Sequence, residues 1–415
     1  MRSWFGIVAG VSMAVQSSWV MGEGILLDVR AGERARRDTI VRWEIPANVS
    51  LPSPARLIRV DTGMDVPHQL DSSGRQTLVW LVDGELPSMT MRRYRIEPGV
   101  KGEAGLARAS CEVVAGADGK TSGLLVSVGG KKVFRYNVAE VQPPADVQPL
   151  FARSGYIHPL WSPAGRVVSN DFPANHNHHH GVWMPWSQTE FEGHPINFWE
   201  QVRLEGKVEC VKASPISGSV FAGVSAEHLF SDLKSKEGKK PVLNETWEVR
   251  VYSIGTYSVV DFSSTQRCAG SSPLLFKGYR YGGFGFRGAG EWEGKDGCEF
   301  LTSQGKTRKD GHETASFWCE MHGQVGGELA GVAFLCHPAN FRAPQNMRIH
   351  DTEPFFNYTP CQDGDFELRP DHSLVSQYRL VVHDGKLGAA ECERLWWDYA
   401  KPPQVIRVVE GEGAH

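Results

Sequence analysis

The stretch Glu245-Thr-Trp-Glu-Val-Arg-Val-Tyr252 alternates between apolar and polar side chains, and Tyr257-Ser-Val-Val-Asp-Phe262 alternates again after the turn Ser253-Ile-Gly-Thr256. A period of two is that of a β-strand, whose successive side chains point to opposite faces of a sheet. Two such runs around a short Gly-containing turn predict an antiparallel hairpin. This hairpin indicates the fold class, because the same pattern recurs along the chain.

Other segments of the chain show the same alternation. They are residues 39–44, 76–81, 123–128, 132–138 and 376–383. Helical periodicity is scarce and is clearest at 389–400, where apolar side chains share one stripe before a pair of prolines. The long central runs lack the spacing of βαβ units, so a parallel α/β sheet is not expected. We predict an antiparallel, all-β protein.

The length and the turn pattern indicate two structural units. At roughly 150 residues per domain, 415 residues correspond to two or three domains. Residues 23–104 hold short strands and Pro-rich turns, which fits a small immunoglobulin-like β-sandwich. Residues 105–400 hold longer strands with loops rich in Trp and His, and we expect them to form the large domain. We expect 401–415 to be a C-terminal tail.

The first 22 residues have the pattern of an export signal. Arg2 is the only charge before Glu23, an apolar run follows it, and small residues near position 22 suit cleavage. The apolar run is shorter than the ~20 residues that span a bilayer. We therefore predict a signal peptide at 1–22 and an exported, periplasmic or extracellular protein without a membrane span after cleavage.

Composition excludes some classes of partner and fold. The chain has 44 basic and 48 acidic residues, and no basic stripe is interleaved with aromatic residues, so nucleic acid is not an expected partner. Its 13 Trp residues suit a large sheet core or stacking on sugar-like ligands. None of the eight cysteines forms a C-x-x-C pair, which excludes zinc-ribbon and thioredoxin-type sites.

The densest chemical signal is a histidine cluster, His176, His178, His179 and His180, in the segment 170–183. On an extended backbone His176, His178 and His180 would point one way and His179 the other. His176, His178 and His180 are therefore the predicted ligands of a divalent metal. The same imidazoles could instead bind hydroxyl groups and exchange protons near neutral pH. The residues leave both alternatives open, and the cofactor is unknown.

Four further segments place a His or a carboxylate beside Pro and an aromatic residue, as rigid loops around a pocket often do. They are residues 156–161, 191–200, 335–342 and 349–356. We predict that these loops meet the histidine cluster in one pocket. The candidate catalytic residues are His158, His178, His179, His337 and Glu353. The candidate substrate-binding residues are Trp183, Asn197, Trp199, Tyr281, Arg342 and His350.

One glycine-rich motif resembles a dinucleotide-binding site, but its surroundings argue against that function. The string Gly283-Phe-Gly-Phe-Arg-Gly288 matches the dinucleotide-binding pattern, but no helix follows it and no βαβ unit surrounds it. We interpret these glycines as positions that permit tight turns or close approach of a ligand.

The strings Arg153-Ser-Gly-Tyr-Ile-His-Pro-Leu-Trp161, His176-x-His-His179 and Gly181-Val-Trp183 resemble a family of exported bacterial proteins labelled "methane oxygenase PmoA-like". The resemblance runs from about residue 25 to 400. Many members of that family carry Arg after the paired histidines, where this chain has His180.

A second resemblance is to the galactose-mutarotase-like supersandwich proteins. It is carried by His337-Pro-Ala-Asn-Phe-Arg342 and by the segment 368–379. This resemblance implies that residues 105–400 form a large antiparallel β-supersandwich. It also implies a sugar as the ligand, with His and Glu as acid and base.

We therefore expect an exported carbohydrate-active enzyme, an epimerase, lyase or hydrolase, that acts on a small sugar or a glycan with His and Glu groups. Two alternatives belong to other classes of protein. One is a non-catalytic carbohydrate-binding protein, and the other is a metal-dependent, oxygenase-type enzyme that uses the histidine cluster.

Overall fold

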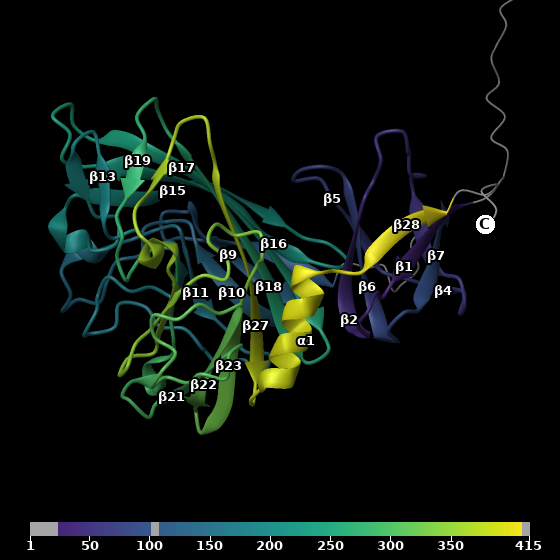
Figure 1. Ribbon diagram of the computed structural model, residues 1–415. Coiled ribbons are helices and arrows are strands. Elements are labelled where there is room, and N and C mark those ends of the chain that lie inside the picture. Colours follow the sequence, from purple (N-terminus) through teal and green to yellow (C-terminus); the bar gives the residue numbers. More distant parts are fainter. Residues whose placement is uncertain (1–23, 101–107, 409–415) are drawn as a thin grey trace, which may run out of the picture.

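The computed structural model describes residues 24–100 and 108–408, which form a large and a small lobe (Figure 1). Antiparallel strands dominate both lobes, so the predicted all-β fold class is confirmed. The predicted export signal at 1–22 lies outside the described residues. Within the described part of the chain, no helix has the length and apolar character needed to cross a membrane. The eight cysteines all carry free thiols.

The large lobe contains two antiparallel sheets of eight strands each, which we call the first and second large sheets. In spatial order, the first large sheet consists of β24 (Met347–Ile349), β25 (Phe355–Tyr358), β20 (Phe284–Arg287), β12 (Val182–Trp183), β11 (Tyr156–Leu160), β10 (Lys131–Asn137), β9 (Thr121–Val128) and β8 (Ala109–Ala115). The second consists of β15 (Gly206–Ile216), β16 (Ala222–Asp232), β17 (Lys240–Ile254), β18 (Tyr257–Cys268), β27 (Leu374–Asp384), β23 (Glu328–Cys336), β22 (Trp318–Val325) and β21 (Cys298–Thr302). This is the architecture of a β-supersandwich.

The hairpin predicted from the alternating stretch is formed by β17 and β18. Ile254 pairs with Tyr257, so the turn contains only two residues and the strand runs two residues further than expected. Gly255 in this turn has a φ of 57°, a left-handed conformation that glycine adopts without strain. Alternate residues such as Trp247 and Val249 are buried in the core, which explains the period of two in the sequence.

The main hydrophobic core lies between the two large sheets. Phe334 of β23 stacks on Phe356 of β25, with ring centroids 4.4 Å apart and planes inclined by 10°. Trp247 of β17 meets Tyr136 of β10 edge to face at 6.1 Å. Because the strands of each pair belong to different sheets, these contacts show that the sheets pack face to face.

The small lobe is a β-sandwich with its own core, in which Trp80 and Tyr94 meet edge to face at 5.5 Å. One sheet has the order β28 (Gln404–Val408), β1 (Ile25–Arg30), β7 (Met91–Pro98), β3 (Ala55–Arg59) and β4 (Met64–Asp65). The other has the order β2 (Arg36–Glu44), β6 (Thr77–Leu86) and β5 (His68–Asp71). The expected tail at 401–415 therefore needs correction, because β28 pairs with β1 and covers its free edge.

The predicted helix is α1 (Ala389–Ala400), whose Cys392, Leu395 and Trp396 are buried. These side chains share a hydrophobic cluster with residues of β2, β18 and β23. The small lobe and α1 thus cover part of the outer face of the second large sheet (Figure 1).

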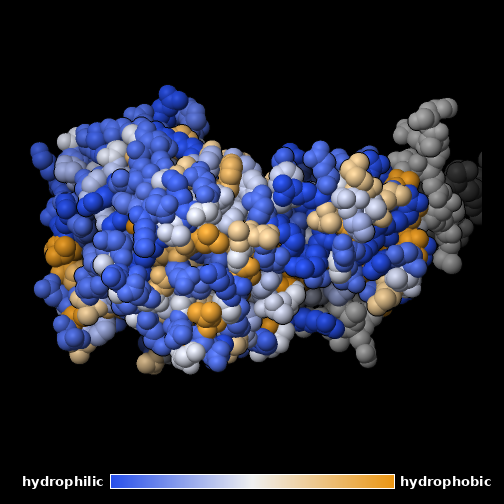
Figure 2. Space-filling model, turned by 60° about the horizontal axis from the view of Figure 1, so that its bottom comes forward, coloured by the Kyte–Doolittle hydropathy of each residue, from blue (hydrophilic) through white to orange (hydrophobic). Residues whose placement is uncertain are grey.

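Shorter elements complete the large lobe. A four-stranded sheet has the order β14 (His194–Ile196), β13 (Thr189–Phe191), β19 (Leu274–Phe276) and β26 (Phe366–Leu368). Short 3-10 helices are η2 (Pro149–Phe151), η3 (Gln201–Arg203), η4 (Gly290–Trp292) and η5 (Pro360–Asp363). On the face that Figure 2 shows, hydrophobic residues are scattered among hydrophilic ones over both lobes. Single exposed apolar residues are ordinary, so the polar cavities are the better guides to function.

Candidate functional site

A cavity of about 110 Å³ lies where the histidine cluster meets the loop that precedes β25, and we call it the histidine pocket. Its lining consists of His176, His178, His179, Ser187, Gln188, Asn197, Trp199, Glu200, Tyr279, Tyr281, His350, Glu353 and Phe355. The first large sheet positions two parts of this lining, because the histidine cluster leads into β12 and Glu353 leads into β25. Imidazole, carboxylate and aromatic groups therefore converge from distant parts of the chain.

The histidine cluster is folded into turns rather than into an extended strand. The backbone N–H of His176 donates to the carbonyl of Pro173 over 2.9 Å, and that of His179 donates to the carbonyl of His176 over 2.8 Å. A turn brings residues i and i+3 together, and the rings of His176 and His179 indeed stack with centroids 4.7 Å apart. The expected alternation along an extended backbone is therefore wrong.

Arg287 of β20 is the polar centre of the site, and its side chain is fully buried. Its Nη1 donates to Glu353 Oε2 over 2.8 Å and to His179 Nδ1 over 3.2 Å. Its Nη2 donates to Asn175 Oδ1 over 3.1 Å and to the carboxylate of Glu293. Because a buried charge must be paired to be tolerated, these contacts hold the histidine turns and Glu353 around one cation.

Glu353 bridges this arginine and the histidine cluster. Its Oε1 lies 3.1 Å from Nδ1 of His176, whose side chain is 34% exposed. Burial alone would raise the pKa of Glu353, but the contacts with His176 and Arg287 outweigh burial and lower the pKa to about 2. The carboxylate is therefore ionised at neutral pH and serves as a hydrogen-bond acceptor.

His178 and His179 are uncharged at neutral pH. Burial lowers the pKa of His178 to about 3, and the neighbouring imidazoles add to this effect. Burial also lowers the pKa of His179 well below its ordinary value. Since Arg287 can only donate to Nδ1 of His179, the single hydrogen of the neutral ring resides on Nε2. The histidine pocket thus contains an imidazole whose Nε2–H is a donor.

Two histidines predicted for the site point elsewhere. His180 is fully buried, and its Nδ1 lies 2.7 Å from Asp171 Oδ1, while Oδ2 of that residue accepts the hydroxyl of Tyr156 over 2.6 Å. His158 Nδ1 contacts Ser169 Oγ over 2.9 Å, and His158 does not line the histidine pocket. The predicted metal trio is split, because the turns direct the third imidazole into the protein interior.

The predicted substrate-binding residues divide in a similar way. Asn197, Trp199, Tyr281 and His350 line the histidine pocket. Trp199 and Tyr281 form an aromatic wall, with ring centroids 5.1 Å apart. Trp183 is fully buried behind the histidines, 5.6 Å from the ring of His179. Trp183 therefore packs behind the histidines and does not line the histidine pocket.

Arg342 and His337 lie outside the histidine pocket, which corrects the prediction that all the loops meet there. Arg342 Nη1 donates to the carbonyls of Pro360 and Gly364 over 2.7 and 2.8 Å and so secures a loop. His337 follows β23 of the second large sheet and lines a different cavity, together with Arg42, Arg250 and Arg379. We call this second cavity the arginine cavity. The two sites are separate because β23 and β25 belong to different sheets.

Several residues of the site were not predicted from the sequence. They are Arg287, Asn175, Glu293, Ser187, Gln188, Glu200, Tyr279 and Phe355. Arg287 lies in the motif 283–288, where the glycines permit close approach of protein groups: a Cβ at Gly285 would lie 3.2 Å from Pro185. A charged residue among aromatic residues and glycines in a buried strand was the available signal.

A metal ion would find three donors here but not a well-prepared site. One donor atom each from His176, His179 and Glu353 lies within 4.8 Å of the others. However, Arg287 places a positive charge beside two of them and keeps the hydrogen of His179 on Nε2, the nitrogen left to coordinate. The donor set therefore fits a metal poorly.

Residues 123–397 match the model of a family described as a family of unknown function, DUF6807. No curated protein matches the sequence. Similar solved structures include a glycosyl hydrolase family 38 protein from Enterococcus faecalis, with 10% identity over 94% of this chain and 48% of that chain and a TM-score of 0.41. A GH36 alpha-galactosidase from Geobacillus stearothermophilus has 12% identity over 67% of this chain and 41% of that chain, with a TM-score of 0.29.

A heparan sulfate lyase from Pedobacter heparinus has 9% identity over 74% of this chain and 43% of that chain, with a TM-score of 0.30. The chain thus spans less than half the length of each of these three proteins. The resemblance to the PmoA-labelled proteins stays a prediction. Because the family model covers more than half of the sequence, the chain belongs to the DUF6807 family.

Proposed function

We propose that this protein is an acid–base enzyme that binds a sugar or one unit of a glycan in the histidine pocket and abstracts a proton from one of its carbons. The observation that carries the proposal is the chain of contacts from Arg287 through Glu353 to His176. Epimerase, lyase and hydrolase activities were expected from the sequence. These contacts favour an epimerase or a lyase. A hydrolase would need a protonated carboxylic acid, and a pKa of about 2 keeps Glu353 ionised.

His176 is the proposed base. Glu353 Oε1 lies 3.1 Å from its Nδ1, which has no aligned hydrogen-bond partner among the described residues. A small rotation of the ring would let the carboxylate accept the hydrogen there and leave the lone pair on Nε2. The carboxylate would also stabilise the imidazolium that forms when Nε2 takes a proton, as carboxylates do beside catalytic histidines. His176 is half-buried, so it can exchange the proton with water.

The neutral imidazoles supply the complementary function. When the C–H bond next to a carbonyl or carboxyl group breaks, its electron pair moves to the substrate oxygen. The Nε2–H of His179 is a fixed donor for that developing negative charge. Protonation of the same carbon from the opposite face, by water in the open cup, would give an epimer. Loss of an alkoxide from the neighbouring carbon, which takes up the proton held by His176, would give an unsaturated sugar.

The aromatic wall supports a sugar as the ligand. Trp199 is 3% exposed, and its Nε1–H has no partner among the described residues. This N–H is shielded from solvent, so Trp199 offers a sugar the apolar face of its ring rather than a hydrogen bond. The volume of about 110 Å³ suits the end of a chain or one ring in an open cup rather than a long chain bound along its length.

Solvent deuterium exchange tests the proposal. The purified protein is incubated in deuterium oxide with 3-keto sugars and with uronate-containing oligosaccharides, and incorporation at carbon is followed by proton NMR. We expect His176→Gln to lower the exchange rate about 10²–10⁴-fold, the usual contribution of a general base. The matched control is His372→Gln, which alters an exposed histidine paired with Asp371 at 2.7 Å.

The outcomes separate the alternatives. Absence of both binding and exchange across the panel would refute the proposal. Binding without exchange, lost in Trp199→Ala but retained in His176→Gln, would indicate a non-catalytic carbohydrate-binding protein.

A second candidate is a metal-dependent enzyme, which is favoured by the proximity of the donors of His176, His179 and Glu353. Elemental analysis of untagged protein tests it directly. A stoichiometric metal that is lost in His179→Gln would contradict the acid–base mechanism and favour the metal-dependent enzyme. A metal-bound His179 could not keep its hydrogen on Nε2.

We also propose that the protein acts outside the cytoplasm, on the basis of the pattern at 1–22. Mass spectrometry of the protein from its native host should give a mature N-terminus near Glu23. Retention of Met1 would contradict this proposal.

A further inference from the structure

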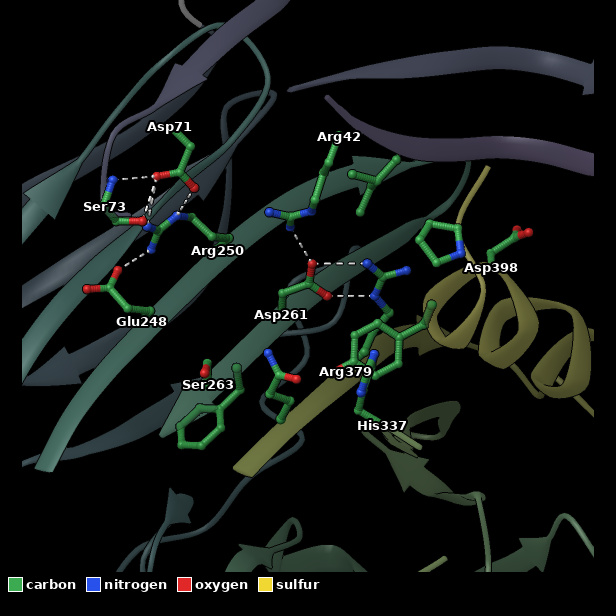
Figure 3. A pocket seen from close by; sticks show the side chains of 15 residues that line it. Arg42, Asp71, Ser73, Glu248, Arg250, Asp261, Ser263, His337, Arg379 and Asp398 are labelled. Atoms are coloured by element: carbon green, nitrogen blue, oxygen red, sulfur yellow. Dashed lines mark hydrogen bonds and ion pairs between the residues drawn. The ribbon is translucent and has the colours of Figure 1, made fainter. Parts of the chain in front are cut away.

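The arginine cavity has a volume of about 340 Å³, within the ~300–1,000 Å³ of typical ligand pockets. Three parts of the molecule form it. Arg42 and Asp71 come from the small lobe, Asp261 and Arg379 come from the outer face of the second large sheet, and α1 closes one side (Figure 3). Junctions between domains are preferred places for ligand sites.

The charged groups of the cavity are paired with one another. At one end, Arg250 Nε and Nη2 lie 3.1 and 3.2 Å from the carboxylate of Asp71. At the other end, Asp261 accepts two hydrogen bonds from Arg379, over 2.6 and 3.0 Å, and one from Arg42, over 2.9 Å. Arg250 and Arg379 are buried, so their pairing fixes the geometry of the lining (Figure 3).

This pairing decides which class of ligand the cavity suits. Arg42 and Arg379 share Asp261, and Arg250 pairs with both Asp71 and Glu248, so three guanidiniums face three carboxylates. The remaining carboxylate of the lining, Asp398, pairs with Arg36, so the lining has no net charge to attract an anion or a metal cation. A hydroxyl group, in contrast, donates one hydrogen bond and accepts others. Neighbouring hydroxyls of a sugar can therefore accept from the remaining N–H groups of an arginine and donate to the carboxylate beside it.

Three uncharged polar groups line the same cavity without a hydrogen-bond partner among the described residues. They are Nε2 of His337, the side-chain amide of Gln377 and the hydroxyl of Ser263. The backbone N–H of Ala339 donates to Nδ1 of His337 over 3.1 Å, so Nε2 carries the hydrogen of the neutral ring. These groups add both donors and acceptors to the lining.

We infer that the arginine cavity is a second binding site, which takes an uncharged polyhydroxylated ligand of one or two sugar rings. The balanced charge and the mixture of donors and acceptors carry this inference, together with the apolar surface of Tyr399 and Pro402. It does not rest on the function proposed for the histidine pocket. In a glycan-acting protein, such a site would hold the polymer while another unit enters the histidine pocket.

The test isolates this site from the histidine pocket. Binding of glucose, galactose, mannose, maltose and cellobiose is measured by saturation-transfer NMR and calorimetry on the full chain carrying Trp199→Ala. His176→Gln is a second background should the first variant fold poorly. The double change His337→Ala and Gln377→Ala then removes two groups, Nε2 of His337 and the side-chain amide of Gln377, that make no hydrogen bond to the described residues in the free protein. The matched control is Gln304→Ala, on an exposed turn.

We expect at least one neutral sugar to bind in both backgrounds, and its affinity to fall at least tenfold in the double variant but not in the control. The thermal unfolding temperature of the double variant should fall only slightly, because His337 gives up one hydrogen bond, from the backbone N–H of Ala339, and the side-chain amide of Gln377 gives up none. Inorganic phosphate is added as a competitor.

Three results would overturn the inference: no sugar binding in either background, equal affinity in the double variant, or displacement of the sugar by phosphate, which would indicate an anion site. Failure at this site is distinguishable from failure of the proposed function. Trp199→Ala alters a wall of the histidine pocket alone, and the deuterium-exchange assay does not report on the arginine cavity.

Discussion

The histidine pocket and the arginine cavity are both polar, yet they limit the cost of buried charge in opposite ways. In the histidine pocket, burial lowers the pKa of His178 to about 3 and leaves the imidazole uncharged. In the arginine cavity, burial would raise the pKa of Asp261, but Arg379 and Arg42 outweigh it and lower that pKa. The histidines of the first site are uncharged, whereas the charged groups of the second site form ion pairs.

The difference follows from the chemistry of the side chains. An imidazole can release its proton near neutral pH, whereas a guanidinium stays charged and must find a carboxylate. Neutral imidazoles retain lone pairs and N–H groups for proton transfer, while paired arginines offer a rigid pattern of donors and acceptors. Arg287 is the exception, because it places a charged pair among neutral rings in the histidine pocket.

The largest expected effect is therefore at Arg287. Arg287→Met leaves Glu353 without its cationic partner, and removal of one partner of a buried ion pair typically costs about 3–5 kcal/mol. Urea unfolding should show this loss, and adding Glu353→Gln should restore part of it. Arg75→Met is the control, since Arg75 and Glu44 form an exposed pair worth less than about 1 kcal/mol. Equal costs for the two variants would refute the central role of Arg287.

A smaller effect is expected at Asp261. Asp261→Asn weakens the hydrogen bonds from two arginines, which should cost about 2–3 kcal/mol in urea unfolding. The cost is limited because Arg42 keeps its contact with the hydroxyl of Tyr252 over 2.6 Å. The variant also leaves positive charge uncompensated, so phosphate should raise its unfolding temperature more than that of the wild type. A phosphate effect equal to that on the wild type would contradict the pairing argument.

The smallest effect concerns pH. The unfolded His178 binds a proton near pH 6.5, but the folded protein resists protonation down to about pH 3. Between these values the unfolded state binds more protons, so stability falls as the pH falls, by about 1.4 kcal/mol per pH unit. Between pH 6.5 and 5.5 the loss is about 1 kcal/mol, because the unfolded histidine is already half protonated at pH 6.5, and His178→Gln should abolish it.

Gln377→Ala, in the arginine cavity, is the control for this experiment, because it removes no titrating group. Chemical unfolding at the two pH values measures both variants. An unchanged pH dependence in His178→Gln would show that His178 is protonated in the folded state.

Local patterns predicted much of the fold. The alternation at 245–262 specified the hairpin of β17 and β18, and the apolar stripe at 389–400 gave the bounds of α1. These features repeat over short distances, and burial of one face imposes their period. The role of 404–408 as a strand could not be predicted, because β28 is paired only by the distant β1.

The candidate site was predicted in part. The sequence singled out the histidine cluster and Glu353 by residue type, and the structure brings Glu353 and three of the four histidines into one pocket. It could not reveal that turns would place His176 on His179 and direct His180 inward, because the backbone hydrogen bonds of the segment decide this.

The sequence by itself determined which residues are capable of chemistry and which segments are strands, because side-chain type and period are local properties. Only the tertiary structure decided their partners. It placed Arg287 between Glu353 and His179, and it assigned His337 to the arginine cavity instead of the histidine pocket. The reason is that pairing, burial and the resulting pKa values depend on distances between residues far apart in the chain, which the packing of the two large sheets sets.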